Sequence, residues 1–147
     1  MAPFLTARQI VKRFASVVAN DRVDFDVGRG EIHALLGENG AGKSTLMQIV
    51  YGQYAMDSGE ILIEGQPARI RHTRDAIDNG IGMIHQEFML VRRFSVVENV
   101  VMGLDAGKGP LVDLKAAAMR LRELSQRHGL QVDPWQLVEH LPVGVQQ

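Results

Sequence analysis

The sequence predicts an α/β fold, and three observations support this prediction. Residues 31–36 are mostly apolar, which is typical of a buried strand, and residues 46–51 form a helical pattern that ends at Gly52. A glycine-rich loop, residues 37–45, connects the two segments. The chain has 147 residues, of which 46% are hydrophobic and 22% charged, so it has the length and composition of one globular core.

Most other elements of the first half are expected to be strands, because they are short, apolar or alternating segments bounded by turn residues. The residues 23–27 alternate strictly between apolar and polar, as in a half-buried strand. The segment 32–36 is apolar on both faces, which predicts a central position in a sheet. With residues 31–36, the expected strands are 5–14, 23–27, 60–64 and 81–85.

Helical patterns dominate the rest of the chain. Thr73 is expected to cap a short helix over residues 74–78, which Asn79 and Gly80 end. Ser95 and Glu98 have the spacing of a capping box before an apolar run. A glycine-rich loop over residues 103–110 follows.

Two further helix starts are predicted near the C-terminal end. Asp113 is placed to cap a helix with an apolar stripe, and Gly129 follows its last turn. Asp133, Pro134 and Trp135 have the pattern of another helix start, with proline in the first turn. We therefore expect a strand-rich part over residues 1–86 and a mainly helical part over residues 87–147.

Composition excludes several functional classes. The net charge is −1, so no basic excess favours nucleic acid as a partner. There is no cysteine, which excludes disulfides and cysteine-ligated zinc and fits a reducing cytosol. No stretch approaches 18 uncharged apolar residues, so no membrane-spanning segment is predicted.

The glycine-rich loop of residues 37–45 gives the strongest indication of function. It matches the pattern G-x-x-x-x-G-K-[ST], whose main-chain N–H groups surround a phosphate, as in P-loop NTPases. Lys43 is expected to reach the β- and γ-phosphates of a nucleotide, and Ser44 to ligate Mg²⁺. The loop residues are Gly37, Glu38, Asn39, Gly40, Ala41, Gly42, Lys43, Ser44 and Thr45, and all except Glu38 are candidate ATP contacts.

Three segments together resemble the ATP-binding cassette (ABC) ATPases: residues 30–46, 58–61 and 82–86, in the order and spacing of that family. The resemblance covers essentially the whole chain. It is strongest to importer cassettes for simple sugars and nucleosides, and residues 85–91 are most similar to the nucleoside (basic-membrane-protein-type) branch. The predicted fold is therefore a P-loop NTPase core with the start of an α-helical subdomain.

The resemblance implies roles for three residues outside the phosphate-contacting core of the loop. Phe14 lies where the family places an aromatic ring that stacks on adenine; the alternative is a core aromatic. Thr45 resembles the residue whose hydroxyl helps to hold the α-phosphate; the alternative is a residue at a helix start that bonds only to its own backbone. Gln86 matches a glutamine that touches Mg²⁺ or the attacking water, with a surface amide as the alternative, and the loop after it would meet the membrane subunit.

The segment at the place of the family signature departs from the usual Leu-Ser-Gly-Gly-Gln. The serine hydroxyl of that motif would bind the γ-phosphate held by the opposing cassette, and proline has neither that hydroxyl nor an N–H group. We therefore expect a weakened contribution to the partner's ATP site, or otherwise a frayed tail. The residues here are Leu141, Pro142, Val143, Gly144 and Val145.

Family resemblance implies an ATP-binding subunit that couples ATP binding and hydrolysis to uptake of a nucleoside or simple sugar. Its partners would be a second cassette and integral membrane permease subunits, at the cytoplasmic face of the cell membrane. The family continues through an apolar strand ending in Asp, a catalytic Glu and a His. We therefore expect this chain to be the front of a longer ATPase, without significant ATPase activity of its own.

Three alternatives remain open at the level of the sequence. A non-transport ABC ATPase of DNA repair or translation would share the loop, although such proteins tend to have zinc cysteines or basic insertions. A soluble phosphotransferase would also use the loop, and would transfer phosphate to a small acceptor. The chain could also be a non-functional truncated product.

Overall fold

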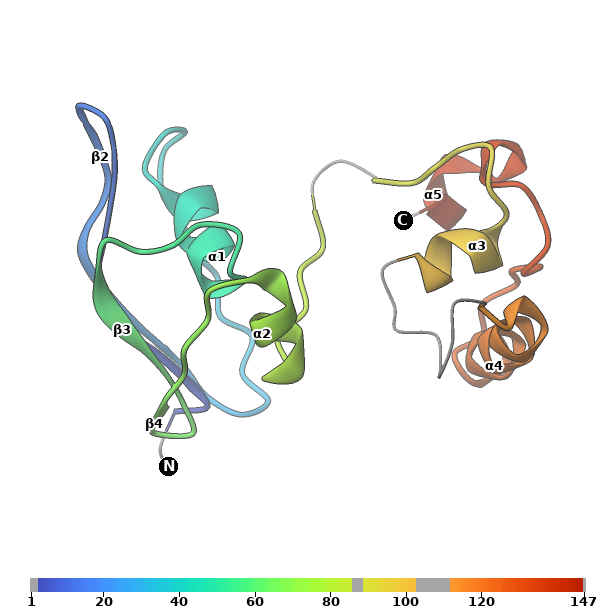
Figure 1. Ribbon diagram of the computed structural model, residues 1–147, viewed down its shortest axis with the longest axis horizontal. Coiled ribbons are helices and arrows are strands. Elements are labelled where there is room, and N and C mark those ends of the chain that lie inside the picture. The colour runs from blue at the N-terminus through green and yellow to red at the C-terminus, as the bar shows by residue number, and fades with distance from the viewer. Residues whose placement is uncertain (1–2, 86–88, 103–111, 147) are drawn as a thin grey trace. The chain divides into compact units, whose positions relative to one another are not determined.

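The computed structural model describes residues 3–85, 89–102 and 112–146, and the chain forms two compact units. Unit 1 is Met1–Ile84 and contains the sheet and two helices, whereas unit 2 is His85–Gln147 and is helical (Figure 1). Each unit has its own buried residues. No described helix is long and apolar enough to cross a membrane.

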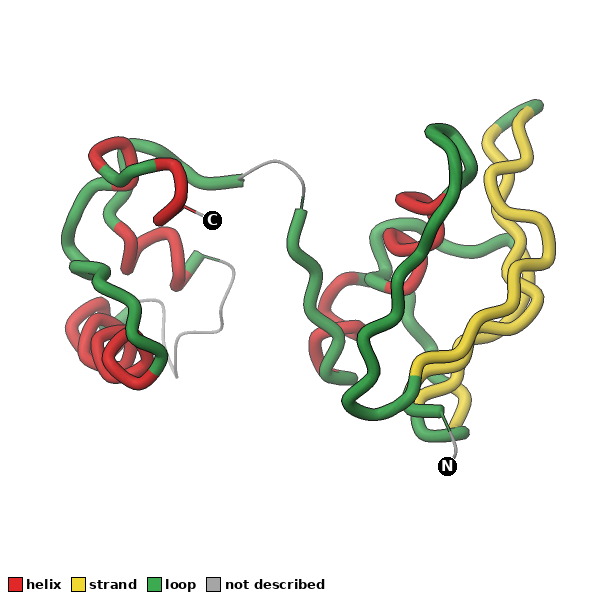
Figure 2. The backbone as a smooth tube through the Cα atoms, turned by 180° about the vertical axis from the view of Figure 1, so that it is seen from behind, coloured by secondary structure: helices red, strands yellow, loops and turns green. Residues whose placement is uncertain are grey.

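Unit 1 is built on an antiparallel sheet with the strand order β2-β1-β3-β4. Leu5, at the start of β1, lies opposite Val27 of β2 and Ile63 of β3. The sheet forms one side of the unit, with the helices on the other side (Figure 2). The strands are β1 (Leu5–Phe14), β2 (Val17–Val27), β3 (Ser58–Ile63) and β4 (Gln66–Pro67), so the predicted strands 5–14, 23–27 and 60–64 are confirmed, and β2 starts earlier than expected.

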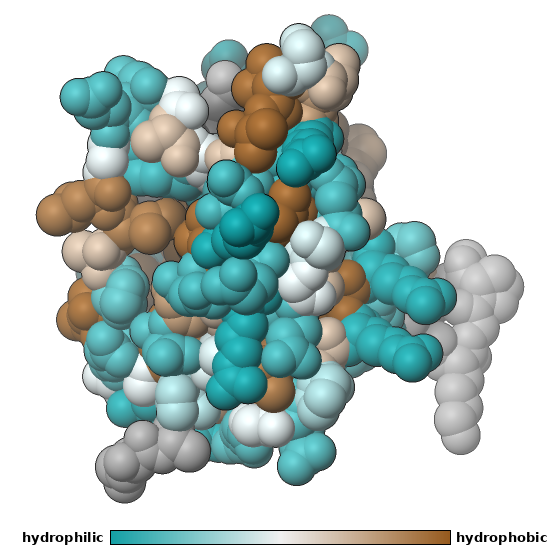
Figure 3. Space-filling view, turned by 90° about the vertical axis from the view of Figure 1, so that its left-hand side faces the viewer, coloured by the Kyte–Doolittle hydropathy of each residue, from teal (hydrophilic) through white to brown (hydrophobic). Residues whose placement is uncertain are grey.

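The core of unit 1 lies between the sheet and helix α1 (Lys43–Val50), which confirms the helix predicted over residues 46–51 and begins three residues earlier. Apolar side chains from one face of the helix and from two strands form a single cluster: Leu5, Ala7, Ile10, Leu46, Ile49, Val50 and Ile61. The outer face of the sheet is mostly hydrophilic (Figure 3). Arg8 and Glu60 pair across adjacent strands, with 3.6 Å between nitrogen and oxygen. Burial on only one face explains the alternating pattern along β2.

Two predicted strands are absent, so these predictions are wrong for this structure: residues 31–36 and 81–85 form loops. Ile32 is 98% exposed, Leu36 is 89% exposed and Ile84 is 95% exposed. A strand that is apolar on both faces becomes stable only between paired neighbours and under covering helices. Among the described residues no strand pairs with either segment, so residues 31–36 remain exposed, whereas Ile81 keeps a partly buried position against the core of unit 1.

Helix α2 (Thr73–Asp78) confirms the short helix, but its cap differs from the prediction. His72, not Thr73, is the capping residue, because Thr73 already has helical geometry. The carboxylate of Asp75 accepts hydrogen bonds from the N–H groups of Arg71 (2.8 Å) and His72 (3.0 Å). This carboxylate therefore fixes the entry of the chain into the helix.

Two helices of unit 2, α3 (Val96–Val101) and α4 (Leu114–Arg127), begin where the sequence predicts. Ser95 and Glu98 form the predicted capping box at α3. The Asp113 carboxylate accepts bonds of 3.0 Å from the N–H groups of Lys115 and Ala116 at the start of α4. The other described helices of the unit are the 3-10 helix η1 (Val138–His140) and α5 (Val143–Gln146), and buried apolar side chains include Val97, Ala118, Pro134 and Val138.

The helix predicted to start at Asp133 is absent. The Asp133 carboxylate instead accepts a 3.2 Å bond from the N–H of Trp135 and closes a turn. The Pro134 carbonyl accepts a 2.8 Å bond from the N–H of Val97, and Ser95 pairs with Leu137 as an isolated bridge. These bonds join the backbone of this segment to the first turn of α3 and its capping residue, which prevents a helix here. The predicted loop over residues 103–110 lies outside the described residues.

Candidate nucleotide-binding site

The glycine-rich loop reverses the chain and opens helix α1. Gly40 (φ 86°) and Gly42 (φ 84°) both have left-handed backbone geometry, which is accessible to glycine at little cost. The N–H of Ala41 donates to the Glu38 carbonyl (3.2 Å), and the N–H of Leu46 donates to the Gly42 carbonyl (2.9 Å). The loop is therefore a tight turn that leads directly into the first turn of the helix.

Lys43 spans this turn with its side chain. Its Nζ donates to the carbonyl oxygens of Gly37 and Glu38, both at 2.7 Å. An ammonium group has three protons, so these two bonds leave one donor for a ligand. The side chain is thus oriented along the loop before any ligand binds.

The main-chain donors at the start of α1 are available for an anion. Within the part of the chain that the structure describes, the N–H groups of Gly42, Lys43, Ser44 and Thr45 have no hydrogen-bond partner. Four such donors and the positive end of the helix dipole favour a phosphate at this position. Ser44 is exposed and Thr45 is half-buried, while Asn39, Gly40 and Ala41 are exposed. The residues present therefore fit the phosphates of a nucleotide.

Strand β2 lies directly against the loop, and Figures 1 and 2 show the loop beside the end of the β1–β2 pair. A Cβ atom on Gly42 would lie 2.0 Å from the carbonyl oxygen of Ala19, so only glycine fits. The Nδ2 of Asn20 donates to the Gly42 carbonyl (3.2 Å) from a side chain that is only 4% exposed. Among the described residues, the Asn20 Oδ1 has no hydrogen-bond partner. Asn20 is not predicted from the sequence, because no local pattern indicates a contact between residues 22 positions apart.

Phe14 ends β1, next to the turn that leads into β2. Its ring is 40% exposed and lies outside the hydrophobic core. The edge of the Tyr54 ring meets it with 5.2 Å between ring centroids and an interplanar angle of 73°. The Nζ of Lys12 lies 5.2 Å from the same ring centroid. The ring is thus held by two neighbours and keeps an accessible surface, although its stacking on adenine stays a prediction.

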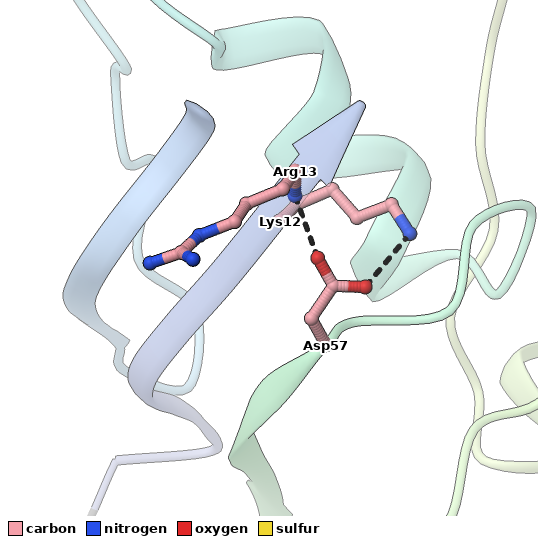
Figure 4. A network of polar contacts seen from close by, with 3 residues as sticks. All are labelled: Lys12, Arg13 and Asp57. Atoms are coloured by element: carbon pink, nitrogen blue, oxygen red, sulfur yellow. Dashed lines mark hydrogen bonds and ion pairs between the residues drawn. The ribbon is translucent and has the colours of Figure 1, made fainter. Parts of the chain in front are cut away.

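A carboxylate lies beside Phe14, between β1 and β3. Asp57 Oδ2 accepts a 2.7 Å bond from the N–H of Arg13, and Oδ1 accepts a 3.2 Å bond from Lys12 Nζ (Figure 4). The Arg13 N–H, and after it the Lys12 ammonium, lower the pKa of Asp57 below its ordinary value of 3.8. From sequence, Asp57 is only a turn residue before β3, so this network was also missed.

The candidate magnesium ligands are divided between described and undescribed residues. Ser44 is described, whereas Gln86 lies outside the described residues, so its role stays a prediction. No group of three His, Asp or Glu side chains that could hold a metal ion occurs in residues 3–85, 89–102 and 112–146. Binding of Mg²⁺ by Ser44 together with nucleotide phosphates also stays a prediction.

The segment at the place of the family signature, Leu141–Val145, belongs to unit 2, and its last three residues lie in α5. The Pro142 carbonyl accepts bonds from the N–H groups of Val145 (2.8 Å) and Gln146 (3.2 Å). Gln146 Nε2 donates to the Leu141 carbonyl (2.8 Å) and the Val138 carbonyl (3.2 Å). The segment is therefore folded onto η1, with Pro142, Val143, Gly144 and Val145 exposed.

Solved structures share this fold. The ADP form of MJ1267, an ATP-binding cassette of an ABC transporter, is 23% identical, with a TM-score of 0.78 over 99% of this chain and 61% of that chain. The protein cbiO1 from Clostridium perfringens, part of the transporter complex cbiONQ, is 24% identical, with a TM-score of 0.75 over 99% of this chain and 58% of that chain. These similarities support the fold, and the P-loop NTPase prediction is confirmed.

Curated relatives are more similar in sequence. The nucleoside import ATP-binding protein NupA of Lactococcus lactis subsp. cremoris is 49% identical over 94% of this chain. The guanosine import protein NupO of Bacillus subtilis is 46% identical over 94%, and the ribose import protein RbsA 1 of Rubrobacter xylanophilus is 48% identical over 100%. The chain spans only 27%, 27% and 30% of the lengths of these three relatives. The sequence profile described as ABC transporter matches residues 20–147, and the chain belongs to this family.

Proposed function

We propose that this chain is part of the ATP-binding subunit of an ABC importer, and that residues 37–45 hold the phosphates of ATP with Mg²⁺. Two neighbouring features support this most directly: the Lys43 ammonium, which bonds to the carbonyl groups of Gly37 and Glu38, and four N–H groups at the start of α1 that have no hydrogen-bond partner among the described residues. A negative group at this position would satisfy all of these donors at once. ABC ATPases in general bind ATP with Mg²⁺.

The residues around the loop have separate roles in this proposal. Phe14 stacks on the adenine ring, and Thr45 holds the α-phosphate. Lys43 reaches the β- and γ-phosphates, while Ser44 and Gln86 ligate the metal. The metal ion neutralises charge that develops on the phosphates during hydrolysis. Residues 1–86 form the ATP-binding core, and residues 87–147 form the segment after Gln86 and the helical subdomain.

We assign the transport role from the relatives, whose names include nucleoside, guanosine and ribose import. The proposed solute is a nucleoside or a simple sugar. The segment after Gln86 contacts integral membrane permease subunits at the cytoplasmic face of the membrane. Leu141–Val145 faces the ATP of a second cassette, and Pro142 makes this contribution weak because it has no hydroxyl or N–H group to donate.

Calorimetric titration of ATP into the chain, with and without Mg²⁺, tests the nucleotide site. Wild type is expected to bind ATP in a magnesium-dependent manner. Lys43→Met is expected to bind at least about tenfold more weakly, a loss of about 1.4 kcal/mol, because the loop loses its ammonium donor. Lys115→Met, which removes an exposed lysine of α4, serves as the control. Equal binding by Lys43→Met and wild type, or no binding by a folded wild type, would contradict the proposal.

A further inference from the structure

Three side chains from two parts of unit 1 lie around the candidate base-stacking ring of Phe14. Lys12 and Phe14 belong to the end of β1, and Tyr54 and Asp57 lie between α1 and β3. We call Lys12, Tyr54 and Asp57 the ring support, because each contacts Phe14 or holds a group that does. Nothing in the motifs of the sequence marks these three residues.

Asp57 takes the place of a missing strand partner. The pairing of β1 with β3 has its last partners at Val11 and Ser58, and β1 continues to Phe14 without β3 beside it. The Arg13 N–H, which the ladder no longer satisfies on that side, donates to the Asp57 carboxylate at 2.7 Å. The N–H of Asp57 donates to the Val11 carbonyl at 2.8 Å. These two bonds fix the direction of the chain immediately before Phe14.

Lys12 connects the same carboxylate to the ring. Its side chain is only 15% exposed, and its ammonium lies 3.2 Å from Asp57 Oδ1 and 5.2 Å from the Phe14 centroid. A cation over a ring face is attracted to the π-electrons, and the edge of Tyr54 meets the ring at 73°. The two contacts restrain the ring, which is still 40% exposed.

We propose that Asp57 is a positioning residue for nucleotide binding: by holding the Arg13 N–H and the Lys12 ammonium, it orients the Phe14 ring to stack on a nucleobase. This inference rests on the proposed ATP site and deepens it. It predicts that Asp57 affects only ligands that carry a base. A purely structural role would instead affect every ligand of the loop, with or without a base.

The test compares Mg-ATP with inorganic tripolyphosphate, which has the phosphates but no base, by calorimetric titration into the full chain. Asp57→Asn is expected to weaken ATP binding by about threefold to tenfold, part of the effect of one stacked base, and to leave tripolyphosphate binding within about twofold. Asp24→Asn is the matched control, because Asp24 also accepts a β1 N–H, that of Gln9 at 2.7 Å, on the side of β1 that pairs with β2. This control should leave the ratio of the two affinities unchanged.

A double variant shows whether Asp57 acts through the ring. In a Phe14→Leu background, Asp57→Asn should have no further effect on ATP binding. The inference would be overturned if Asp57→Asn weakened ATP and tripolyphosphate binding equally, or if it weakened neither. It would also be overturned if Asp57→Asn had its full effect on ATP binding in the Phe14→Leu background. Wild type that is folded by circular dichroism but binds neither ligand would instead refute the ATP site itself. If Asp57→Asn does not fold, Lys12→Met must show the same base-selective loss, or the inference is wrong.

Discussion

Replacing Gly42 with alanine tests how the phosphate loop is held against β2. The new Cβ would lie 2.0 Å from the Ala19 carbonyl oxygen and 2.9 Å from Asn20 Nδ2. Real Cβ atoms do not approach other atoms so closely, so either the strand or the loop must move. Gly80 is the matched control, because it has a similar φ of +79° but nothing within 4 Å of its added Cβ.

The expected cost of Gly42→Ala has three parts. Left-handed geometry costs alanine about 1–2 kcal/mol relative to glycine. The forced displacement of packed backbone adds about 1–3 kcal/mol, as for other overpacked sites. Alanine also reduces the conformational entropy of the unfolded chain, which stabilises the folded state by about 0.4–1 kcal/mol. With the middle of each range, the net loss is about 3 kcal/mol, against about 1 kcal/mol for Gly80→Ala, which has only the first and last parts.

Urea unfolding followed by circular dichroism measures both variants without nucleotide. For a chain of 147 residues, each kcal/mol also shifts the melting temperature by about 2–4 °C. Gly42→Ala should therefore melt clearly below Gly80→Ala. If the two variants are equally stable, the contact between the loop and Ala19 does not constrain the loop, and the reasoning from close packing fails.

Three further predictions concern single contacts. Asn20→Leu should change stability by less than about 1 kcal/mol in urea, because the loss of its bond to Gly42 is offset by removal of a buried oxygen without a partner. Asp113→Ala should cost about 1 kcal/mol and lower helix content by circular dichroism, because it removes the cap of α4. The Ser95 hydroxyl, and after it the Ser95 N–H, lowers the pKa of Glu98 below its ordinary value of 4.5. The Glu98 carboxylate therefore stabilises the fold above pH 4.5, and this stabilisation is lost as the pH falls through the lowered pKa. Glu98→Gln should make urea stability less dependent on pH in that acid range; an unchanged pH dependence would contradict this assignment.

Local patterns in the sequence predicted the elements that depend on local bonds. The capping box at Ser95 and Glu98 closes within one helical turn, and so does the cap at Asp113. The phosphate loop is similar, because its glycines and Lys43 contact one another within a few residues. Such elements need no distant partner, which explains why their sequence patterns were sufficient.

The failed predictions share the opposite property. Residues 31–36 and 81–85 have the composition of buried strands, but a strand exists only when another strand accepts and donates its hydrogen bonds. The Asp133–Trp135 segment has a helix-start pattern, yet distant bonds to Val97 and Ser95 determine its conformation. Hydrophobic periodicity indicates what a segment can bury, but it does not indicate whether a partner is present.

The same distinction separates the two halves of the candidate site. The turn of the phosphate loop is encoded locally, whereas two other parts of the site depend on contacts between segments distant in sequence: Asp57 with Arg13 beside the candidate base-stacking ring, and Asn20 with Gly42 where the loop meets β2. Asn20 illustrates the difference in energy as well as in sequence: a buried amide oxygen without a partner costs about 1–3 kcal/mol. An apolar side chain would avoid that cost and would lose the bond to the Gly42 carbonyl. The presence of Asn20 is therefore better explained by its bond to the phosphate loop, which helps to fix the geometry of that loop, than by a contribution to the stability of the sheet.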